Sequence, residues 1–137
     1  MRDILPDEFK TGHDEIDDQH RDFLALSDEI KMCIVEKNRK RIKMLYVKLL
    51  DHIMNHFIYE ELLMYKMGYP MNKLEEHRYR HRELQHLYLE CFRPILSDKM
   101  ELETIIDVFE NQFVHHLATM DKDMISFIKS RQLRIQL

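Results

Sequence analysis

This sequence predicts an all-α protein folded as an up-down antiparallel four-helix bundle. Apolar residues recur with helical spacing in four long segments of the chain. Two glycines and three prolines in 137 residues leave few positions for the many turns of an all-β fold. The connections between the four segments are short, and short connections between long helices favour antiparallel neighbours.

The first predicted helix covers about residues 17–36. Its apolar stripe consists of Phe23, Leu24, Ser27, Ile30 and Ile34. His20 lies one turn before this stripe and on the same helix face. The pattern therefore predicts that one imidazole faces the core.

The second predicted helix carries a carboxylate within its apolar stripe. The apolar members of the stripe are Ile42, Leu45, Leu49, Ile53 and Leu63. His56 and Glu60 are four residues apart and continue the stripe, so both side chains stack on the core face. Glu61 follows directly, and helix phase predicts that it points outward. Gly68 and Pro70 end the helix.

The third predicted helix adds two more imidazoles. His77 and His81 are four residues apart, so both can aim at one point in space. They lie in register with the apolar residues Leu74, Leu84 and Tyr88. The helix stops near Pro94.

The fourth predicted helix is capped by Ser97 or Asp98 and carries His116 on its apolar face. The other members of that face are Leu102, Ile105, Phe109, Phe113 and Met120. Asp121 follows His116 by five residues, a spacing that an ordinary α-helix rotates away from its partner. A local π-bulge or a widened turn would bring both side chains inward, and such bulges are frequent at functional sites.

The length favours a single domain over residues 1–137, with a short N-terminal arm over 1–15 and a C-terminal helical extension over 124–137. The apolar residues of this extension are Met124, Ile125, Phe127, Ile128, Leu133, Ile135 and Leu137. Two interpretations stay open for it. It packs back on the bundle, or it connects the bundle to a protein partner or output domain.

Charge and targeting signals exclude several classes of protein. The net charge of -4 at pH 7 does not favour nucleic acid as a partner. The basic run is best explained as a solvated connection between helices, and it consists of Lys37, Arg39, Lys40, Arg41 and Lys43. The sequence has no stretch apolar enough to cross a membrane and no N-terminal signal, so we expect a cytoplasmic protein. Cys33 and Cys91 lack disulfide or metal spacing and are expected to be reduced thiols of the core or its boundary.

Five imidazoles and two carboxylates form the candidate metal-ligand set. They are His20, His56, Glu60, His77, His81, His116 and Asp121. Such a set without thiolates is typical of iron or manganese rather than structural zinc, and seven ligands are too many for one ion. A lone histidine on an apolar face is more often a hydrogen-bonded core residue. That explanation does not suffice for all seven groups together, because each unpaired buried charge is strongly unfavourable. A set of this size needs a compensating charge such as a metal ion. The sequence therefore predicts a dinuclear metal site.

The remaining histidines and the methionines are given other roles. His13, His52, His86 and His115 fall off the apolar stripes or duplicate a neighbour, so we expect them at or near the surface. The ten methionines are expected to fill the core, because thioethers suit copper better than an oxygen-rich site.

Four short motifs occur in a fixed order along the chain. They are Ile16-Asp17-x-Gln19-His20, His56-Phe57-x-x-Glu60-Glu61, Tyr69-Pro70 followed by His77-x-x-x-His81, and His116-Leu117-x-x-x-Asp121. In this order and at these separations they resemble the motifs of bacterial hemerythrins (bacteriohemerythrins), a family of non-haem di-iron oxygen-binding proteins. The resemblance runs from about residue 12 to 128. One departure is Gln112, because the family commonly has a tryptophan there.

This resemblance implies two iron ions (Fe2+/Fe3+) with a bridging oxo or hydroxo group and dioxygen as ligand. It implies that His77, His81 and His116 hold one iron, that His20 and His56 hold the other, and that Glu60 and Asp121 bridge both. Dioxygen would bind at the open position of the two-histidine iron. An apolar wall that includes Val114 would surround that position.

The implied function is reversible oxygen binding for storage, delivery or scavenging, without enzymatic turnover. The alternative is an oxygen- or redox-sensing domain that signals through the C-terminal helix. A di-iron oxidase or peroxidase is disfavoured, because the candidate ligands do not form the carboxylate-rich Glu-x-x-His pattern of the ferritin-like enzymes.

Overall fold

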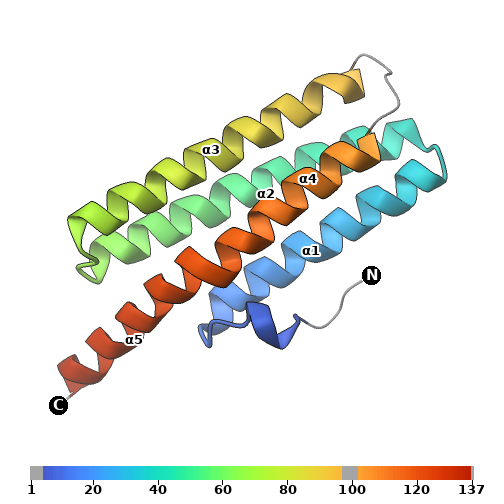
Figure 1. Ribbon diagram of the computed structural model, residues 1–137. Helices are drawn as coiled ribbons and strands as arrows, with labels where there is room; N and C mark the ends of the chain where they lie inside the picture. Colours follow the sequence, from blue (N-terminus) through green and yellow to red (C-terminus); the bar gives the residue numbers. More distant parts are fainter. Residues whose placement is uncertain (1–4, 97–101, 137) are drawn as a thin grey trace.

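The computed structural model describes residues 5–96 and 102–136, and every regular element in this part of the chain is helical. The elements are the 3-10 turn η1 (Asp7–Phe9), α1 (Asp14–Val35), α2 (Arg39–Lys66), α3 (Met71–Leu96), α4 (Leu102–His116), the π-helical turn η2 (Leu117–Asp121) and α5 (Lys122–Gln136). Helices α4 and α5 are joined through η2 into one continuous helix, whose α4 part packs against α1 and α3, and α1 and α3 each pack against α2 (Figure 1). The predicted all-α four-helix bundle is confirmed.

Helix α1 begins three residues earlier than its apolar stripe predicts. The ring Nδ1 of His13 accepts a hydrogen bond from the backbone N–H of Ile16 at 3.3 Å and so caps the helix. The arm before it is held by Asp17, whose carboxylate accepts from the backbone N–H groups of Thr11 at 2.9 Å and Gly12 at 3.1 Å. The early start was missed because histidine is not among the usual N-cap residues.

The turn between α1 and α2 is tight, which corrects the prediction for the basic run. Only Lys37 of that run lies in the connection, where its φ is 58°. Asn38 caps α2 by accepting from the backbone N–H of Arg41 at 3.2 Å. The other basic residues therefore form the first turns of α2, and they are exposed as expected. The prediction failed because Asn38 was not recognised as an N-cap, which starts the helix before its apolar stripe.

Helix α2 ends as predicted at Gly68 and Pro70. Gly68 has φ +73°, which suits a residue without a side chain, and the backbone N–H of Tyr69 donates to the carbonyl of Met64 at 2.9 Å. Helix α3 starts directly after Pro70 and runs slightly beyond Pro94. The proposed caps Ser97 and Asp98 lie outside the described residues.

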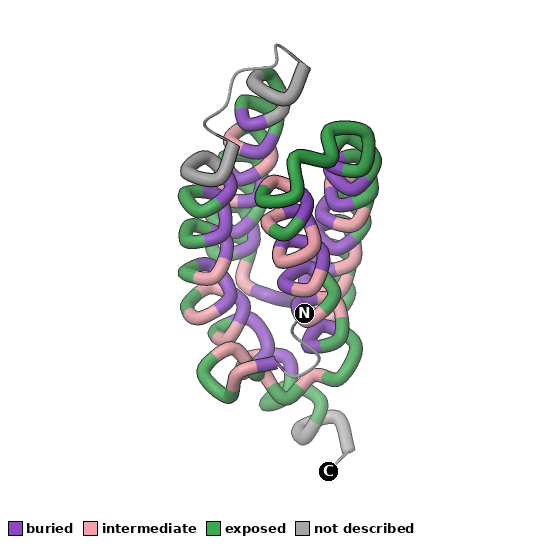
Figure 2. The backbone as a smooth tube through the Cα atoms, turned by 90° about the vertical axis from the view of Figure 1, so that its right-hand side faces the viewer, coloured by how far each residue is buried: buried purple, intermediate pink, exposed green. Residues whose placement is uncertain are grey.

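The buried side chains form two apolar clusters along the bundle axis, and Figure 2 shows the buried positions along its inner faces. The larger one, called here the main core, includes Phe23, Phe57, Leu84, Tyr88 and Phe113. The smaller one, the lower core, consists of Ile16, Met64, Tyr69, Leu74, Met124, Ile125 and Ile128. Along each long helix, the candidate ligands lie between the residues of the main core and those of the lower core. They therefore form a polar layer between two apolar ones.

The methionines do not fill the core as predicted. Met64 and Met124 are fully buried, whereas Met32, Met44, Met54 and Met71 are exposed by 40% to 65%. The four lie off the core stripes, and the unbranched, flexible side chain tolerates exposed helix positions. Cys33 and Cys91 are buried and are not joined in a disulfide, as predicted.

The C-terminal extension begins as part of the bundle and then leaves it. Met124, Ile125 and Ile128 are fully buried in the lower core. From Lys129 to Gln132 the side chains are exposed, although Lys129 lies beside Gly12 and Arg131 lies beside Gly68, and the end of α5 projects from the bundle (Figure 1). Within the described residues, no helix combines the length and apolar character needed to cross a bilayer.

Candidate metal centre

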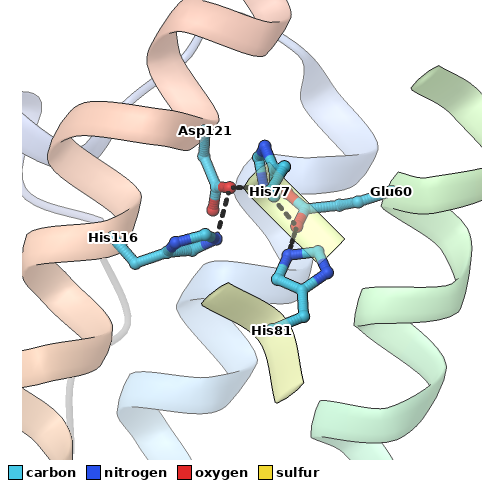
Figure 3. Close-up of side chains that lie close together, drawn as sticks. All are labelled: Glu60, His77, His81, His116 and Asp121. Atoms are coloured by element: carbon cyan, nitrogen blue, oxygen red, sulfur yellow. Dashed lines mark hydrogen bonds and ion pairs between the residues drawn. The ribbon is translucent and has the colours of Figure 1, made fainter. Parts of the chain in front are cut away.

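The structure brings all seven candidate ligands together in the polar layer. Each of them is at most 2% exposed. Their donor atoms form two overlapping groups, within each of which all atoms lie within 4.8 Å of one another. The first group consists of Glu60, His77, His81, His116 and Asp121, and the second consists of His20, His56, Glu60 and Asp121. Figure 3 shows the first group, with its side chains converging from α2, α3 and the α4–η2 helix.

Asp121 and Glu60 are the two residues common to both groups. Asp121 Oδ1 lies 2.9 Å from His77 Nε2 and 3.0 Å from His116 Nε2, while Oδ2 lies 3.1 Å from His20 Nε2. Each oxygen of this carboxylate therefore faces a different group of imidazoles, which is the arrangement that a bridging ligand needs.

Glu60 is placed between the same two groups. Its Oε1 lies 3.1 Å from His81 Nε2 and 3.4 Å from His56 Nε2, and its Oε2 lies 3.9 Å from His20 Nε2. In every one of these contacts the histidine presents Nε2 to the carboxylates. The second ring nitrogen, Nδ1, is left to face outward.

The π-helical turn η2 explains how His116 and Asp121 share the centre. In a π turn the hydrogen bonds join residues five apart, so side chains at that spacing stack, as those four apart do in an α-helix. Because η2 covers Leu117–Asp121, the turn spans the interval that separates the two ligands. The prediction of a π-bulge at this place is confirmed.

Burial and neighbouring charges lower the pKa of some ligand imidazoles and raise the pKa of others. Burial lowers the pKa of His56 to about 4 and also lowers the pKa of His116. For His77, burial acts in the same direction, but hydrogen bonds and charges from Asp121 and Glu60 outweigh it and raise the pKa to about 9. The pKa of His81 is likewise raised by the carboxylates despite burial.

The two carboxylates remain ionised although they are buried. Burial raises the pKa of Asp121, yet the imidazoles of His116, His20 and His77 together hold it well below its usual range. The pKa of Glu60 is also lowered, against burial and against the charge of Asp121, by its imidazole neighbours. The raised pKa values of His77 and His81 thus favour the charged form of these two imidazoles beside the carboxylates when no metal is bound.

The chemistry of the donor set fits a pair of metal ions. Within the described residues, every buried side-chain nitrogen or oxygen without a hydrogen-bond partner belongs to the candidate ligands. These atoms are His20 Nδ1 and Nε2, His56 Nε2, Glu60 Oε2, His77 Nδ1, His116 Nδ1 and Nε2, and Asp121 Oδ2. Unpartnered buried polar groups are strongly unfavourable, and cations would satisfy the lone pairs that face the centre.

Two residues outside the predicted ligand set contact the outward-facing Nδ1 of a ligand imidazole. Gln19 Oε1 accepts from Nδ1 of His56 at 2.5 Å, and Glu61 Oε2 lies 3.1 Å from Nδ1 of His81. Glu61 was expected to point outward, and this prediction was wrong. Its backbone phase does turn away from the centre, but the long side chain reaches across to α3, where it also meets Arg78 at 2.9 Å.

The pKa of Glu61 is lowered overall. Burial raises it, but the hydrogen bonds and charges of His81 and Arg78 outweigh burial. Both Gln19 and Glu61 stand next to a candidate ligand in the sequence. That adjacency is the signal that could have pointed to them.

Aromatic rings close the centre on the side of the main core. The ring of Phe113 lies 6.4 Å from that of His20 and 6.3 Å from that of His56, and it stacks on Phe23 at 3.8 Å. Val114, the predicted wall residue, is half-buried and packs against the main core.

Gln112 and the four histidines outside the ligand set lie away from the centre. Gln112 is exposed and accepts a hydrogen bond from Arg80, so the replacement of the family's tryptophan falls on the surface. His86 and His115 are exposed, and His13 and His52 are half-buried, as expected.

The fold and the two overlapping groups define a helical-bundle protein with a candidate dinuclear metal centre. The model of the hemerythrin HHE cation-binding domain matches residues 11–128, and the chain belongs to this family. A similar relative is a protein of Stenotrophomonas maltophilia (strain R551-3) named bacteriohemerythrin, with 31% identity over 67 residues. That match covers 49% of this chain and 44% of the relative, so the chain spans less than half of the relative's length. No solved structure matches the chain.

Proposed function

We propose that this protein binds dioxygen reversibly at a pair of iron ions, for oxygen storage, delivery or scavenging. Membership of the hemerythrin family supports a cation-binding role. The observation that carries the proposal is that Glu60 and Asp121 each belong to two groups of donors with unequal numbers of imidazoles.

The unequal groups suit two ions with different tasks. His77, His81 and His116 would hold one iron, His20 and His56 would hold the other, and the two carboxylates would bridge them. The two-histidine group offers one protein donor fewer, which leaves room for an external ligand on that side. An iron pair held by these residues, with its oxo or hydroxo group from solvent, would supply the two electrons that reversible dioxygen binding requires.

The surrounding side chains keep this site dry. Phe23, Phe57 and Phe113 are each at most 1% exposed, and Phe113 stands beside both imidazoles of the two-histidine group. An apolar wall excludes water and slows the entry of protons, which favours release of intact dioxygen over irreversible oxidation. We extend this wall to Val114, which packs against the same core.

The test is to measure iron per chain and then repeated cycles of oxygenation and deoxygenation by absorption spectroscopy. We expect two irons per chain and an oxy form that survives several cycles. His56→Ala should abolish oxygen binding, whereas His86→Ala, which removes an exposed imidazole on α3, should leave it unchanged. One iron per chain, or zinc that iron cannot replace, would contradict the proposal. Steady consumption of oxygen with an electron donor would show an enzyme instead.

A second function, oxygen or redox sensing, is favoured by one specific feature. Asp121 ends the π turn and Lys122 begins α5, so a candidate bridging ligand is joined directly to the helix that leaves the bundle. A shift of Asp121 would move α5 as a rigid continuation. The discriminating measurement is trypsin cleavage at exposed Lys129 and Arg131 in the oxidised and reduced protein. A large difference in cleavage rate supports sensing, and equal rates support storage or delivery.

A further inference from the structure

The outward-facing Nδ1 atoms of the five ligand imidazoles differ in their hydrogen-bond partners. Only two of the five Nδ1 atoms have a hydrogen-bond partner among the described residues, namely those of His56 and His81. The partner of His56 is the neutral amide of Gln19, and the partner of His81 is the carboxylate of Glu61. The two histidines belong to different donor groups, so each group contains one imidazole that is held from behind.

Three residues of α2 clamp the ring of His81. Phe57 stacks on its face with ring centres 3.9 Å apart and an interplanar angle of 8°. Glu60 Oε1 meets Nε2 and Glu61 Oε2 meets Nδ1, each at 3.1 Å. The ring is therefore fixed by a stacked face and by both of its nitrogens.

Arg78 holds Glu61 in turn. Its Nε lies 2.9 Å from Glu61 Oε1, which leaves Oε2 to face His81. Arg78 precedes His81 by less than one turn on α3, so the guanidinium and the imidazole meet the same carboxylate from one helix. The Glu61 side chain is 27% exposed, and this contact lies at the border between the polar layer and solvent.

A carboxylate and an amide act differently on the imidazole they hold. When Nε2 binds a metal, Nδ1 carries the proton and donates it in the hydrogen bond. An anionic acceptor draws that proton more strongly, which makes Nε2 a stronger donor to the metal. Stronger donation stabilises the higher oxidation state of iron, whereas the neutral amide of Gln19 gives a weaker effect.

We propose that Glu61 is a positioning residue for His81 and that its charge, set against the neutral Gln19 behind His56, makes the three-histidine iron the more readily oxidised of the pair. This inference rests on the proposed iron pair and is independent of dioxygen binding.

The test compares Glu61→Gln, Glu61→Ala and Gln19→Glu in the full chain, with Glu83→Gln as the matched control. Glu83 is a carboxylate on α3 that pairs with Arg80 at the surface. Iron content and thermal melts come first. The ratio of ferrous to ferric iron is then measured by Mössbauer spectroscopy in a series of redox buffers.

We expect Glu61→Gln to keep both irons and to raise the ferrous-to-ferric ratio at a fixed buffer potential by about tenfold. Gln19→Glu should shift the ratio in the opposite direction, and in the half-oxidised protein it should move ferric character toward the two-histidine iron. Glu61→Ala should show the same shift as Glu61→Gln and also release iron to a chelator faster, because the ring of His81 is no longer held. Glu83→Gln should match the original chain.

Two results would overturn this inference while leaving the iron pair intact. One is an unchanged ratio in Glu61→Gln, and the other is a shift of the same sign in Gln19→Glu and Glu61→Gln. Fewer than two irons in the original chain would instead refute the proposed function, and this inference with it.

Discussion

The main core and the polar layer are equally buried, yet they differ in how their polar groups are satisfied. In the main core, the hydroxyl of Tyr88 donates to the backbone carbonyl of Tyr46, and Ser27 donates to Glu110 at 2.8 Å. In the polar layer, the imidazoles and carboxylates leave several buried atoms without a protein partner. The main core is complete as a folded structure, whereas the polar layer needs something that the chain does not supply. A site of this kind reveals itself through unmet hydrogen bonds.

Iron removal should produce the largest effect, because it acts only on the polar layer. Ligands from all four long helices meet there, so metal binding and folding are coupled. At a free-metal concentration a thousandfold above the dissociation constant, each bound ion adds about 4.1 kcal/mol to stability, and the two donor groups would hold two ions. Thermal melts at pH 7.5 with iron and after reductive chelation should differ clearly. Iron should also be released as the pH falls from 7.5 to 4.5, since protons compete for the imidazoles. Identical melting curves with iron and after chelation would show that the stability of the polar layer does not depend on bound metal.

Removal of a shared carboxylate should cost more metal than removal of a single imidazole. Glu60→Ala deletes an anion that both donor groups use, whereas His20→Ala deletes one neutral donor from one group. Iron per chain should therefore fall further in Glu60→Ala. The control is Glu83→Ala, because Glu61 touches His81 and cannot serve as a neutral reference. Normal iron content in Glu60→Ala would refute the bridging role.

A cavity in the main core should separate stability from metal binding. Leu84 is fully buried there, and Leu84→Ala should destabilise the protein by about 2–5 kcal/mol. Iron content measured below the melting temperature should stay at the original value, because this side chain belongs to an apolar contact set. Loss of iron in proportion to the loss of stability would mean that the two regions do not act separately.

The smallest expected effect is the pH dependence of the metal-free protein. The folded-state pKa of His77, about 9, lies above the ordinary value of 6.5, so its stabilising contribution is complete below pH 6.5 and is lost as the pH rises through 9. The folded-state pKa of His56, about 4, lies below the ordinary value, so its contribution is lost as the pH falls from 6.5 to 4. Melts should therefore show a maximum near pH 6.5. With iron bound, the alkaline decrease should be absent, because ligating imidazoles are already neutral.

Features that depend on the spacing of residues along one helix can be predicted from the sequence. The bundle and the convergence of His20, His56, His77 and His81 follow from helical spacing, since a helix fixes which side chains share a face. Asp121 does not follow from α-helical spacing. Asp121 faces the centre only because a π turn, which the structure contains, lies between it and His116.

Contacts between helices were harder to foresee. Glu61 reaches His81 because α2 and α3 pack side by side and its side chain is long enough to cross between them. Helix phase describes the direction of the Cα–Cβ bond but not the reach of a flexible side chain. The support of His56 by Gln19 was missed for the same reason, because it depends on the packing of α1 against α2.

The π turn has a further consequence for how this helix tolerates changes in chain length. Upstream of it, Phe109 and Phe113 face the bundle, and downstream Met124, Ile125 and Ile128 do so. One residue fewer between His116 and Asp121 would leave these two ligands four apart, which is the spacing of an ordinary α-helix. The aspartate and the inward side of α5 would still face the bundle, on a helix wound by regular α-helical turns. The turn is therefore a place where the gene could lose one codon while the inward faces on both sides of it are kept.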